Sequence, residues 1–221
     1  MKNADALSLP TLIAAILSTK GGVAKTTDTA NLGGYLADRE LKVLMIDADI
    51  RQPTLSSYYP FDNEAPGGIY ELIAQNELEP TTIISHTTIP GLDIIISNDP
   101  RGELMNLLQA APDGVIRLRH LVRHIPGYDV ILIDTIGART IALEMVLLAS
   151  DLIISPVLPE MLSAREFLRG TLQMYRDLQP FTRYGILLPP LNAVIHKLDH
   201  TNDAREITHN LLHVLQHKQQ E

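Results

Sequence analysis

The chain has 221 residues, of which 45% are hydrophobic and 20% are charged, an ordinary globular composition that allows one domain with a complete core. It contains no cysteine, which excludes a disulfide scaffold, an iron–sulfur cluster and a thiolate zinc site, and which fits the cytoplasmic location that we expect. The formal net charge of −8 gives no general attraction to DNA or anionic lipid, so any nucleic-acid contact needs a local basic patch or a partner.

Apolar runs of strand length alternate with helical patterns along the chain. The runs are continuous, which is typical of strands buried on both faces, and all are far shorter than the ~20 residues that cross a bilayer. We therefore expect no membrane contact and an α/β domain with a doubly wound, mainly parallel sheet flanked by helices. The predicted strands cover residues 12–17, 42–46, 92–97, 130–134, 152–157 and 192–196, and the predicted helices cover residues 25–38, 68–74, 115–124, 140–149, 164–178 and 203–217.

Proline and glycine clusters at residues 60–68 and 189–190 predict loops, and the polar end over residues 217–221 is expected to fray. The first apolar run is followed by Lys-Gly-Gly rather than by a cleavage-site pattern, so it is interpreted as a buried strand and not as a signal peptide. No repeat or linker interrupts the pattern, and we expect one domain over residues 1–221.

A glycine-rich turn lies between the first predicted strand and the first predicted helix. This context predicts a phosphate cradle, because glycine leaves backbone N–H groups open and a helix N-terminus attracts anions. Lys25 is expected to contact the β- and γ-phosphates, and the Thr26 hydroxyl to bind Mg²⁺, a hard ion that prefers oxygen. The candidate nucleotide-binding residues are Lys20, Gly21, Gly22, Val23, Ala24, Lys25, Thr26 and Thr27.

The turn departs from the standard G-x-x-x-x-G-K-[ST] spacing, because Thr19 and Ala24 stand at the two glycine positions. Its sequence K-G-G-V-A-K-T-T resembles the deviant Walker A motif K-G-G-x-G-K-[ST] of the ParA/MinD family of dimeric P-loop ATPases. V-L-M-I-D-A-D, which ends at Asp49, looks like the second acidic strand end of that family. Y-D-V-I-L-I-D-T, which contains Asp134, looks like its Walker B strand.

A fourth segment, H-K-L-D over residues 196–199, has the spacing of the N-K-x-D base-reading motif of related P-loop proteins. The family-like features extend from about residue 12 to residue 199, and the resemblance is strongest to the ParA (Soj)-type partition proteins of plasmids and integrated mobile elements. The family pattern includes one more strand and helix after this segment, and the domain that we expect over residues 1–221 could either lack this element or be truncated before it.

The resemblance implies a role for each matched charged residue. Lys20, the additional lysine, would reach across a dimer to the partner's phosphates, whereas Lys25 would act within its own chain. Both would stabilise charge on the γ-phosphoryl oxygens during ATP hydrolysis. Asp49 would position the attacking water, and Asp47 and Asp134 would lie in the outer shell of the metal. Carboxylates at the carboxyl ends of neighbouring parallel strands converge on one crevice, which agrees with these roles.

A carboxylate at such a place can also simply cap a helix or end a strand. We prefer this structural role for Asp129 and Asp151, and the site role for the three aspartates above. Five arginines, Arg117, Arg119, Arg123, Arg165 and Arg169, fall at spacings that leave several on one helix face. They predict either phosphate-binding patches or solvated helix faces, and the net charge favours the second.

Two residues depart from the family pattern. Ala24 stands where the family has glycine, and at positive φ its Cβ would cost ~1–2 kcal/mol and crowd the phosphates. His196 stands where an asparagine amide would read the base, and an imidazole replaces only part of that hydrogen bonding. His196 could therefore contact the base or only a local partner, and the residues leave both roles open.

Three functions are compatible with these motifs. The favoured one is a ParA-type ATPase that uses ATP and Mg²⁺ and acts as an ATP-gated dimerisation switch in DNA partition. It implies an ATP-bound homodimer, a ParB-like or other adaptor protein, and non-specific DNA. The second is a nucleotide-binding scaffold with weakened catalysis. The third is a capsule-type bacterial tyrosine kinase domain, which the stretch D-A-D-I-R-Q-P resembles, although the sequence shows no C-terminal tyrosine cluster.

Overall fold

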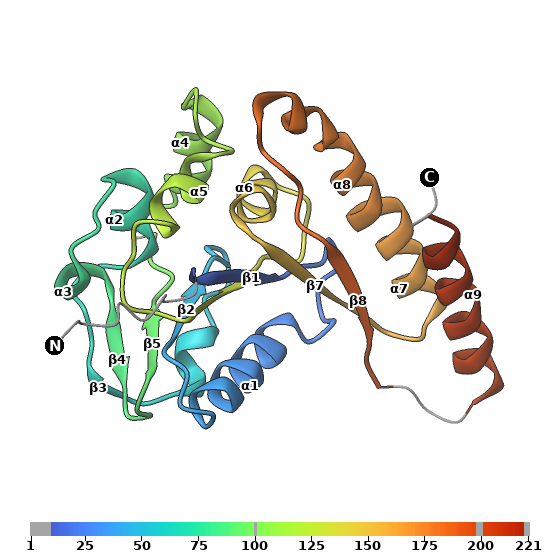
Figure 1. Cartoon of the computed structure of the whole chain (residues 1–221), viewed down its shortest axis with the longest axis horizontal. Helices are drawn as coiled ribbons and strands as arrows, with labels where there is room; N and C mark the ends of the chain where they lie inside the picture. Colours follow the sequence, from blue (N-terminus) through green and yellow to red (C-terminus); the bar gives the residue numbers. More distant parts are fainter. Residues whose placement is uncertain (1–9, 100, 198–200, 219–221) are drawn as a thin grey trace, which may run out of the picture.

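A computed structural model describes residues 10–99, 101–197 and 201–218. Its strands form one sheet of eight in the order β3-β4-β5-β2-β6-β1-β7-β8 (Figure 1). The six strands from β5 to β8 in this order run parallel, whereas β3, β4 and β5 pair antiparallel. The strands are β1 (Leu12–Ile16), β2 (Val43–Asp47), β3 (Phe61–Asn63), β4 (Ser85–Thr87), β5 (Leu92–Ile95), β6 (Val130–Asp134), β7 (Leu152–Val157) and β8 (Leu191–Ile195).

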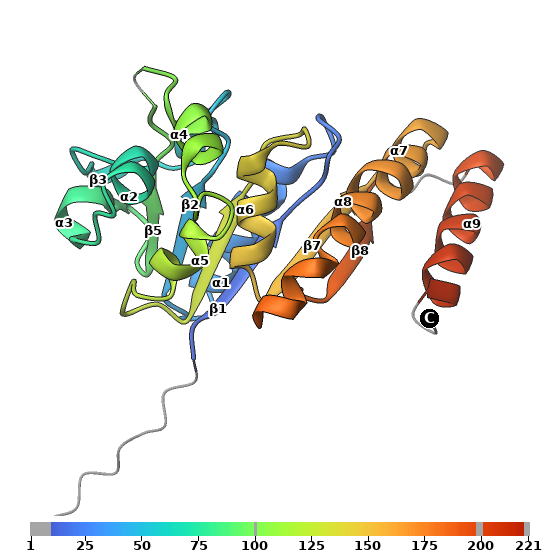
Figure 2. The same ribbon diagram turned by 90° about the horizontal axis from the view of Figure 1, so that it is seen from above.

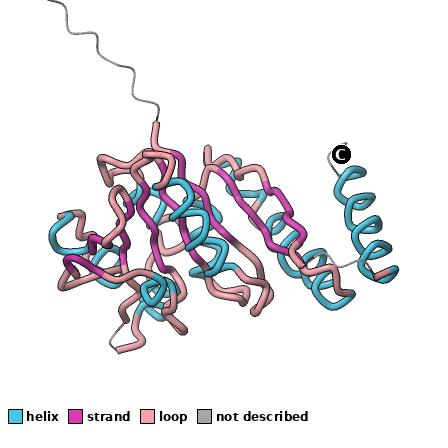
Figure 3. Tube along the Cα trace, turned by 90° about the horizontal axis from the view of Figure 1, so that it is seen from below, coloured by secondary structure: helices cyan, strands magenta, loops and turns pink. Residues whose placement is uncertain are grey.

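Helices cover both faces of this sheet, as the view from below shows (Figure 3). None of the described helices is long and apolar enough to cross a membrane. The α-helices are α1 (Lys25–Ala37), α2 (Ile69–Ala74), α3 (Pro80–Ile83), α4 (Leu104–Ala110), α5 (Arg117–Val122), α6 (Ile141–Ala149), α7 (Met161–Glu166), α8 (Leu172–Asp177) and α9 (Asn202–Lys218). A π-helical turn, η2 (Phe167–Thr171), joins α7 to α8, and two 3₁₀ turns are η1 (Leu55–Tyr58) and η3 (Gln179–Tyr184).

The two faces of the sheet bury alternate residues of each strand. Ile13 and Ala15 of β1 pack in a core with α2, α5 and α6, whereas Ala14 and Ile16 pack with α1 on the opposite face. Because both sets are apolar, the strand reads as a continuous apolar run, as expected for a strand covered on both sides. The predicted doubly wound α/β architecture is therefore confirmed.

A third, smaller core lies at the β8 edge of the molecule. It joins the end of β7 to α7, η2 and α9 through Val157, Ala164, Phe167 and Leu211. In the view from above, α9 lies beside α7 at the far edge of the structure (Figure 2). This arrangement places one helical segment, from α7 through α8, between the sheet and α9.

The predicted elements differ from the observed ones at the opposite edge of the sheet. All six predicted strands are present with ends within two residues, but the loop predicted over residues 60–68 contains β3, and β4 and the helices α3 and α4 were not predicted. β3 and β4 have three residues each and are defined by antiparallel pairing rather than by an apolar run. The fraying expected over residues 217–221 lies mostly outside the described residues, since α9 ends at Lys218.

Candidate nucleotide-binding site

The glycine-rich turn occupies residues 17–24, between the end of β1 and the start of α1. Two of its residues have left-handed backbone conformations, Gly22 with φ +73° and Ala24 with φ +72° and ψ +20°. Glycine adopts this conformation freely, whereas a Cβ makes it costly. Ala24 is therefore held at a position that favours glycine, directly before the first residue of α1, where its carbonyl accepts the Asp28 amide at 2.9 Å.

The turn borders a cavity of about 230 Å³ at the carboxyl end of the sheet. Six of the eight loop residues predicted to bind nucleotide line it, together with residues that follow β2 and β6. The lining consists of Gly21, Gly22, Ala24, Lys25, Thr26, Thr27, Asp49, Gln52, Thr54, Thr135 and Gly137. Val23 lies away from it, in the interior, with no exposed surface. The cavity is open enough for phosphate groups and is bordered by backbone amides at the N-terminus of α1, which suits an anion.

Lys25 is the buried cation of this cavity, with 7% of its surface exposed. Its ammonium group donates a hydrogen bond to the carbonyl oxygen of Lys20 at 3.3 Å. Burial lowers the pKa of Lys25, and the neighbouring carboxylates of Asp134 and Asp49 partly restore it. A buried ammonium with few fixed partners is well placed to neutralise phosphate oxygens.

The side chain of Lys20 points away from the cavity that Lys25 lines. Its side chain does not line the cavity, and its ammonium nitrogen lies 3.7 Å from Oε2 of Glu160 at the start of α7. Glu160 is 62% exposed, so this ion pair is screened by water and holds Lys20 only weakly. The two lysines of the turn are thus separated, one facing its own cavity and one at the side of the site.

Asp47 and Asp134 are neighbours across the paired strands β2 and β6, and neither has exposed surface. The two Asp47 oxygens accept the backbone amides of Asp49 and Leu55, both at 3.1 Å. Burial, and then repulsion from Asp134, raise the pKa of Asp47 to about 7. Asp47 therefore braces the turn after β2, and any effect that it has on a metal is indirect.

Asp134 has one oxygen that lacks a protein partner. Its Oδ1 accepts the Thr29 hydroxyl at 3.4 Å, whereas the buried Oδ2 has no hydrogen bond among the described residues. Burial raises the pKa of Asp134 to about 6, although the Thr26 hydroxyl and the Lys25 ammonium favour the ionised form. A buried, unpartnered oxygen is costly unless a further ligand reaches it, and a hydrated cation would supply the missing donor.

Asp49 lies at the rim of the cavity with its carboxylate oriented by its own turn. Its Oδ1 accepts the amides of Arg51 at 3.2 Å and Gln52 at 3.1 Å. No hydrogen bond among the described residues uses Oδ2 of Asp49, which can accept a hydrogen bond from water. The local amides fix this carboxylate without occupying both oxygens, as a water-positioning residue requires.

Four further lining residues escaped prediction, namely Gln52, Thr54, Thr135 and Gly137. The Thr135 hydroxyl donates to the Ile16 carbonyl at 2.7 Å and so ties the end of β6 to the end of β1. A Cβ on Gly137 would lie 2.6 Å from the Gly21 Cα and 3.1 Å from the Lys25 ammonium. Only glycine fits there, and the glycine three residues after Asp134 was the sequence signal that could have located this contact.

His196 lies within hydrogen-bond distance of Asp28 in the first turn of α1, with 2.8 Å between Nε2 and Oδ2. This is the local partner that was one of its two expected roles, and His196 does not line the cavity described above. Contact with a base stays a prediction. Leu198 and Asp199, the last two residues of the predicted base-reading segment, lie outside the described residues.

Asp129 and Asp151 have the structural roles that we preferred for them. Asp129 accepts the Lys42 amide at 2.8 Å, and Asp151 accepts the Ile13 amide at 3.1 Å and pairs with Arg123 at 2.6 Å. Each aspartate therefore joins neighbouring strand ends on the side of the sheet where β1, β2 and β6 begin.

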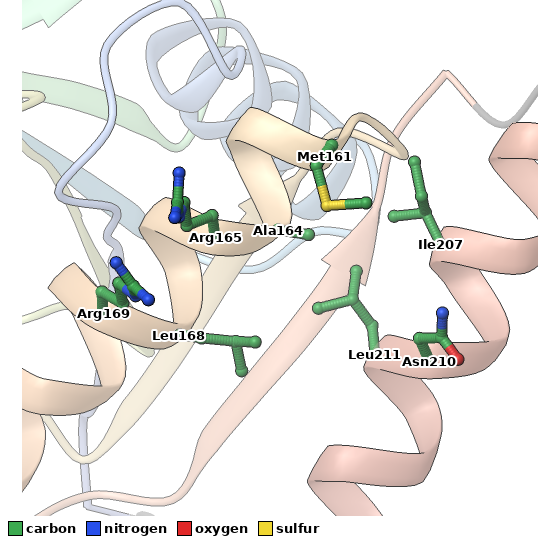
Figure 4. A pocket seen from close by; sticks show the side chains of 8 residues that line it. All are labelled: Met161, Ala164, Arg165, Leu168, Arg169, Ile207, Asn210 and Leu211. Carbon is green, nitrogen blue, oxygen red and sulfur yellow. The ribbon is translucent and has the colours of Figure 1, made fainter.

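The five helical arginines divide into two groups. Arg117 pairs with Asp113 at 2.7 Å, Arg119 donates to the Leu148 carbonyl at 2.9 Å, and Arg123 pairs with Asp151, so these three are occupied by structural contacts. Arg165 and Arg169 form no ion pair among the described residues. They border an apolar groove of about 480 Å³ between α7 and α9, and their guanidinium groups point away from α9 (Figure 4).

The donors available to a metal here are one hydroxyl and one carboxylate rather than a cluster of carboxylates. Within the described part of the chain, no three His, Cys, Asp or Glu side chains gather as a metal site. Thr26 lines the cavity and Asp134 offers a buried, unpartnered oxygen beneath it, and this donor set of one hydroxyl and one carboxylate suits Mg²⁺ completed by phosphate and water. The residues present therefore fit a magnesium–nucleotide ligand.

The fold and the cavity define a P-loop nucleotide-binding protein with two lysines in its phosphate loop. A family model described as an AAA domain matches residues 11–184. A ParA family protein of Chlamydia pneumoniae is 31% identical over 180 residues, which cover 79% of this chain and 70% of that protein. The chain belongs to the ParA/MinD family of P-loop ATPases.

Other proteins are similar either over a small share of their length or chiefly in their fold. A tyrosine-protein kinase of Acinetobacter johnsonii is 41% identical over 73 residues, 33% of this chain and 10% of that protein. A cobyrinic acid a,c-diamide synthase of Mycobacterium smegmatis, with bound ATP analogue and magnesium, has a TM-score of 0.78 at 24% identity and covers 91% of this chain and 82% of that one. A plasmid partition protein of Borrelia burgdorferi has a TM-score of 0.73 at 25% identity and covers 91% and 85%.

The coverage of the relatives is uneven. The chain spans 70% of the chlamydial protein but only 54% and 57% of two other curated relatives.

Proposed function

We propose that this chain is a ParA-type ATPase, a switch that dimerises when ATP is bound and acts in DNA partition or in the maintenance of a plasmid, chromosome region or mobile element. One observation carries the proposal, namely that the two lysines of the phosphate loop point to different places. Lys25 faces the cavity of its own chain, and Lys20 lies outside it beside Glu160. A lysine that does not serve its own site is available to complete the site of a second copy.

ATP with Mg²⁺ is the cofactor that these residues suit. Thr26 would hold the metal directly, Asp134 would act through water, and Asp47 would support Asp134 from the neighbouring strand. When bound, the metal neutralises charge on the β- and γ-phosphates. The chain's own residues would do the rest: Lys25 stabilises the γ-phosphoryl oxygens, the loop amides bind the phosphates, and Asp49 orients the attacking water.

Lys20 is held loosely enough to change partners. Its ion pair with Glu160 is 3.7 Å long and is open to water on the Glu160 side, where the side chain is 62% exposed, so the pair contributes little free energy. The phosphates of a nucleotide in a facing chain would attract the same ammonium group more strongly, because they carry more charge in a drier environment. The proposed functional unit is therefore a homodimer with two composite sites, working with an adaptor protein of the ParB type and with non-specific DNA.

The two alternatives are supported by narrower observations. Ala24, at φ +72°, favours a scaffold that binds nucleotide with weakened turnover. The local similarity to a tyrosine-protein kinase favours a kinase domain, but it covers 33% of this chain, against 79% for the ParA family protein. The broader similarity is the reason to prefer the partition ATPase.

The proposal is tested by sizing the protein without nucleotide, with ADP and with ATP, each with Mg²⁺, and by single-turnover ATP hydrolysis. Wild type should dimerise only with ATP. Lys20→Ala should keep nucleotide affinity within about threefold of wild type but remain monomeric, since it removes only the cross-dimer charge. Lys25→Ala should lose nucleotide affinity itself.

Each result separates the competing functions. A Lys20→Ala protein that still dimerises with ATP would refute the trans role of this lysine. Wild-type hydrolysis no faster than that of Lys25→Ala would leave the scaffold function. Phosphorylation of a tyrosine peptide by the wild type would support the kinase. Repeating the sizing with DNA at increasing salt tests the DNA contact, because binding through phosphates weakens steeply with salt.

A further inference from the structure

Thr19, the residue directly before Lys20, is bound by a small cluster of hydroxyl and carboxylate groups. Its backbone amide donates to the Thr171 hydroxyl at 3.2 Å, and the two threonine hydroxyls lie 3.1 Å apart. The Thr19 hydroxyl also donates a hydrogen bond to Oε1 of Glu166 at 3.1 Å. Thr171 has no exposed surface, so the two contacts between Thr19 and Thr171 form away from water, where hydrogen bonds are strongest and costly to lose. The bond to Glu166 is partly buried.

The partners of Thr19 come from one helical segment, far along the chain. Glu166 ends α7 and Thr171 ends the π-helical turn η2. A Cβ on Gly170 would overlap both the Thr19 hydroxyl and the Glu166 carboxylate, so glycine is needed for this close approach. A π-helical turn inside a longer helix changes the direction of the side chains around it, and such turns often occur at functional sites.

The same segment also contacts the next residue of the loop. Glu160, which precedes α7, lies 3.7 Å from the Lys20 ammonium. The backbone of Lys20 is fixed on its other side, because its carbonyl accepts the Lys25 ammonium at 3.3 Å and its amide donates to the Ser18 hydroxyl at 3.2 Å. Thr19 is therefore the point at which the direction of Lys20 is set, and its position depends on Thr171 and Glu166.

We propose that Thr171 and Glu166 are positioning residues for Lys20: by anchoring Thr19 to the α7–η2 segment they fix the direction in which Lys20 leaves the phosphate loop. The inference rests on the proposed function in so far as Lys20 acts across a dimer. Neither residue lines the nucleotide cavity, so their loss should impair what Lys20 does and largely spare what Lys25 does. In this way the η2 turn links the edge of the domain to its phosphate loop.

The test compares Thr171→Val, which keeps the shape but removes the hydroxyl, with Thr171→Ser, which keeps the hydroxyl. Glu166→Ala and Glu166→Gln form a second pair at a partly exposed position: the alanine removes the hydrogen-bond acceptor of the Thr19 hydroxyl, and the glutamine keeps one. Thr87→Val is the matched control, since Thr87 in β4 is also buried and its hydroxyl donates to the Leu92 carbonyl at 2.6 Å, away from the cavity. Melting curves show whether each variant folds.

Thr171→Val and Glu166→Ala should weaken ATP-dependent dimerisation by about tenfold and change nucleotide affinity by less than about threefold, the size expected for a lost buried hydrogen bond. Thr171→Ser, Glu166→Gln and Thr87→Val should dimerise like wild type. The double variant Lys20→Ala/Thr171→Val should dimerise no more weakly than Lys20→Ala alone, because Thr171 acts through Lys20. Wild-type dimerisation of Thr171→Val, an equal loss of nucleotide affinity, or additive losses would each overturn the proposal.

Amide exchange gives a readout that does not depend on the dimer. Without nucleotide, the Thr19 and Lys20 amides should exchange about tenfold faster in Thr171→Val than in wild type or Thr87→Val, because the acceptor of the Thr19 amide is gone. If wild type fails to dimerise with ATP, the proposed function fails, while the exchange rates still decide whether the anchor exists. Unchanged exchange would show that Thr171 does not position the loop.

Discussion

A single methyl group is the main irregularity of the phosphate loop. Ala24 has φ +72° and lines the nucleotide cavity, at a place where the family motif has glycine. A Cβ in the left-handed region costs about 1–2 kcal/mol, and the methyl group lies in the lining of the cavity that we propose for the phosphates. The surrounding structure holds this conformation because α1 starts at the next residue.

Ala24→Gly should tighten nucleotide binding by up to about tenfold, because it removes both the strain of the loop and the methyl group near the phosphates. The change in affinity is measured by titration with a fluorescent ATP analogue. Gly34, in α1, provides the reverse comparison, since Gly34→Ala alters the helix without touching the cavity. Equal affinities of Ala24→Gly and wild type would mean that the loop has adapted to the methyl group.

The buried carboxylates carry a different kind of cost. Asp134, with an unpartnered oxygen and a pKa raised to about 6, is less stable as an ion in the folded protein than in water. A raised folded-state pKa means that its contribution to stability is complete below its ordinary pKa of 3.8 and is lost as the pH rises through about 6. Asp47, with a pKa raised to about 7, acts in the same sense.

Asp134→Asn should therefore raise the free energy of unfolding at pH 8 by roughly 1–2 kcal/mol without metal or nucleotide, and raise it less at pH 5, where wild-type Asp134 is largely protonated. Urea unfolding at the two pH values measures both differences. A variant that is destabilised equally at pH 5 and pH 8 would show that the charge of Asp134 is compensated in the folded protein. Under the proposed function the same variant should also lose ATP hydrolysis, because the buried charge that lowers stability is the one proposed to act on the metal.

At the scale of secondary-structure elements, one polar contact near the site joins the end of β8 to α1. His196 follows β8 and pairs with Asp28 at 2.8 Å, in the first helical turn after the phosphate loop. Burial raises the pKa of Asp28, and the facing imidazole lowers it again. Since both side chains are largely buried, removal of one leaves the other without its partner.

Asp28→Asn and His196→Gln should each lower the free energy of unfolding by about 1 kcal/mol, and the double variant should lose little more than either single one. The same proteins are then titrated with ATP and GTP. If His196 only joins the two elements, both single variants should keep the preference for ATP over GTP. A preference altered by His196→Gln alone would show that the imidazole contacts the base.

Elements were predictable where their own residues dictate them. The long apolar runs of β6 and β7 and the Lys25 start of α1 follow from local pattern, because strands covered on both faces must be apolar throughout. β3 and β4 were not predictable in this way, since Phe61–Asn63 has no apolar run and becomes a strand only by pairing with β4. The π-helical turn η2 was also hidden, because its sequence continues an ordinary helical pattern.

In the whole molecule, strand order brings the motifs together. β6 lies between β2 and β1 in the sheet, although it follows them by many residues in the chain. Ile16, Asp134 and Asp47 are therefore aligned across three adjacent strands, and the phosphate loop, the Asp49 turn and Gly137 face one cavity. Because helices cover both faces of the sheet, a ligand can reach it only at the ends of its strands. In doubly wound sheets the crevice that binds ligands lies at the carboxyl ends.

The sequence by itself determined the fold class, the phosphate loop and the acidic strand ends, because each depends on a short pattern whose chemistry is local. Tertiary structure decided the rest. It placed Lys25 at the cavity and Lys20 outside it. It left Asp47 hydrogen-bonded to backbone amides and one Asp134 oxygen without a partner among the described residues. It also brought Thr171 to Thr19, more than 150 residues away in the chain. These outcomes depend on which strands and helices become neighbours, and a buried polar group is satisfied only by the residues that packing brings to it.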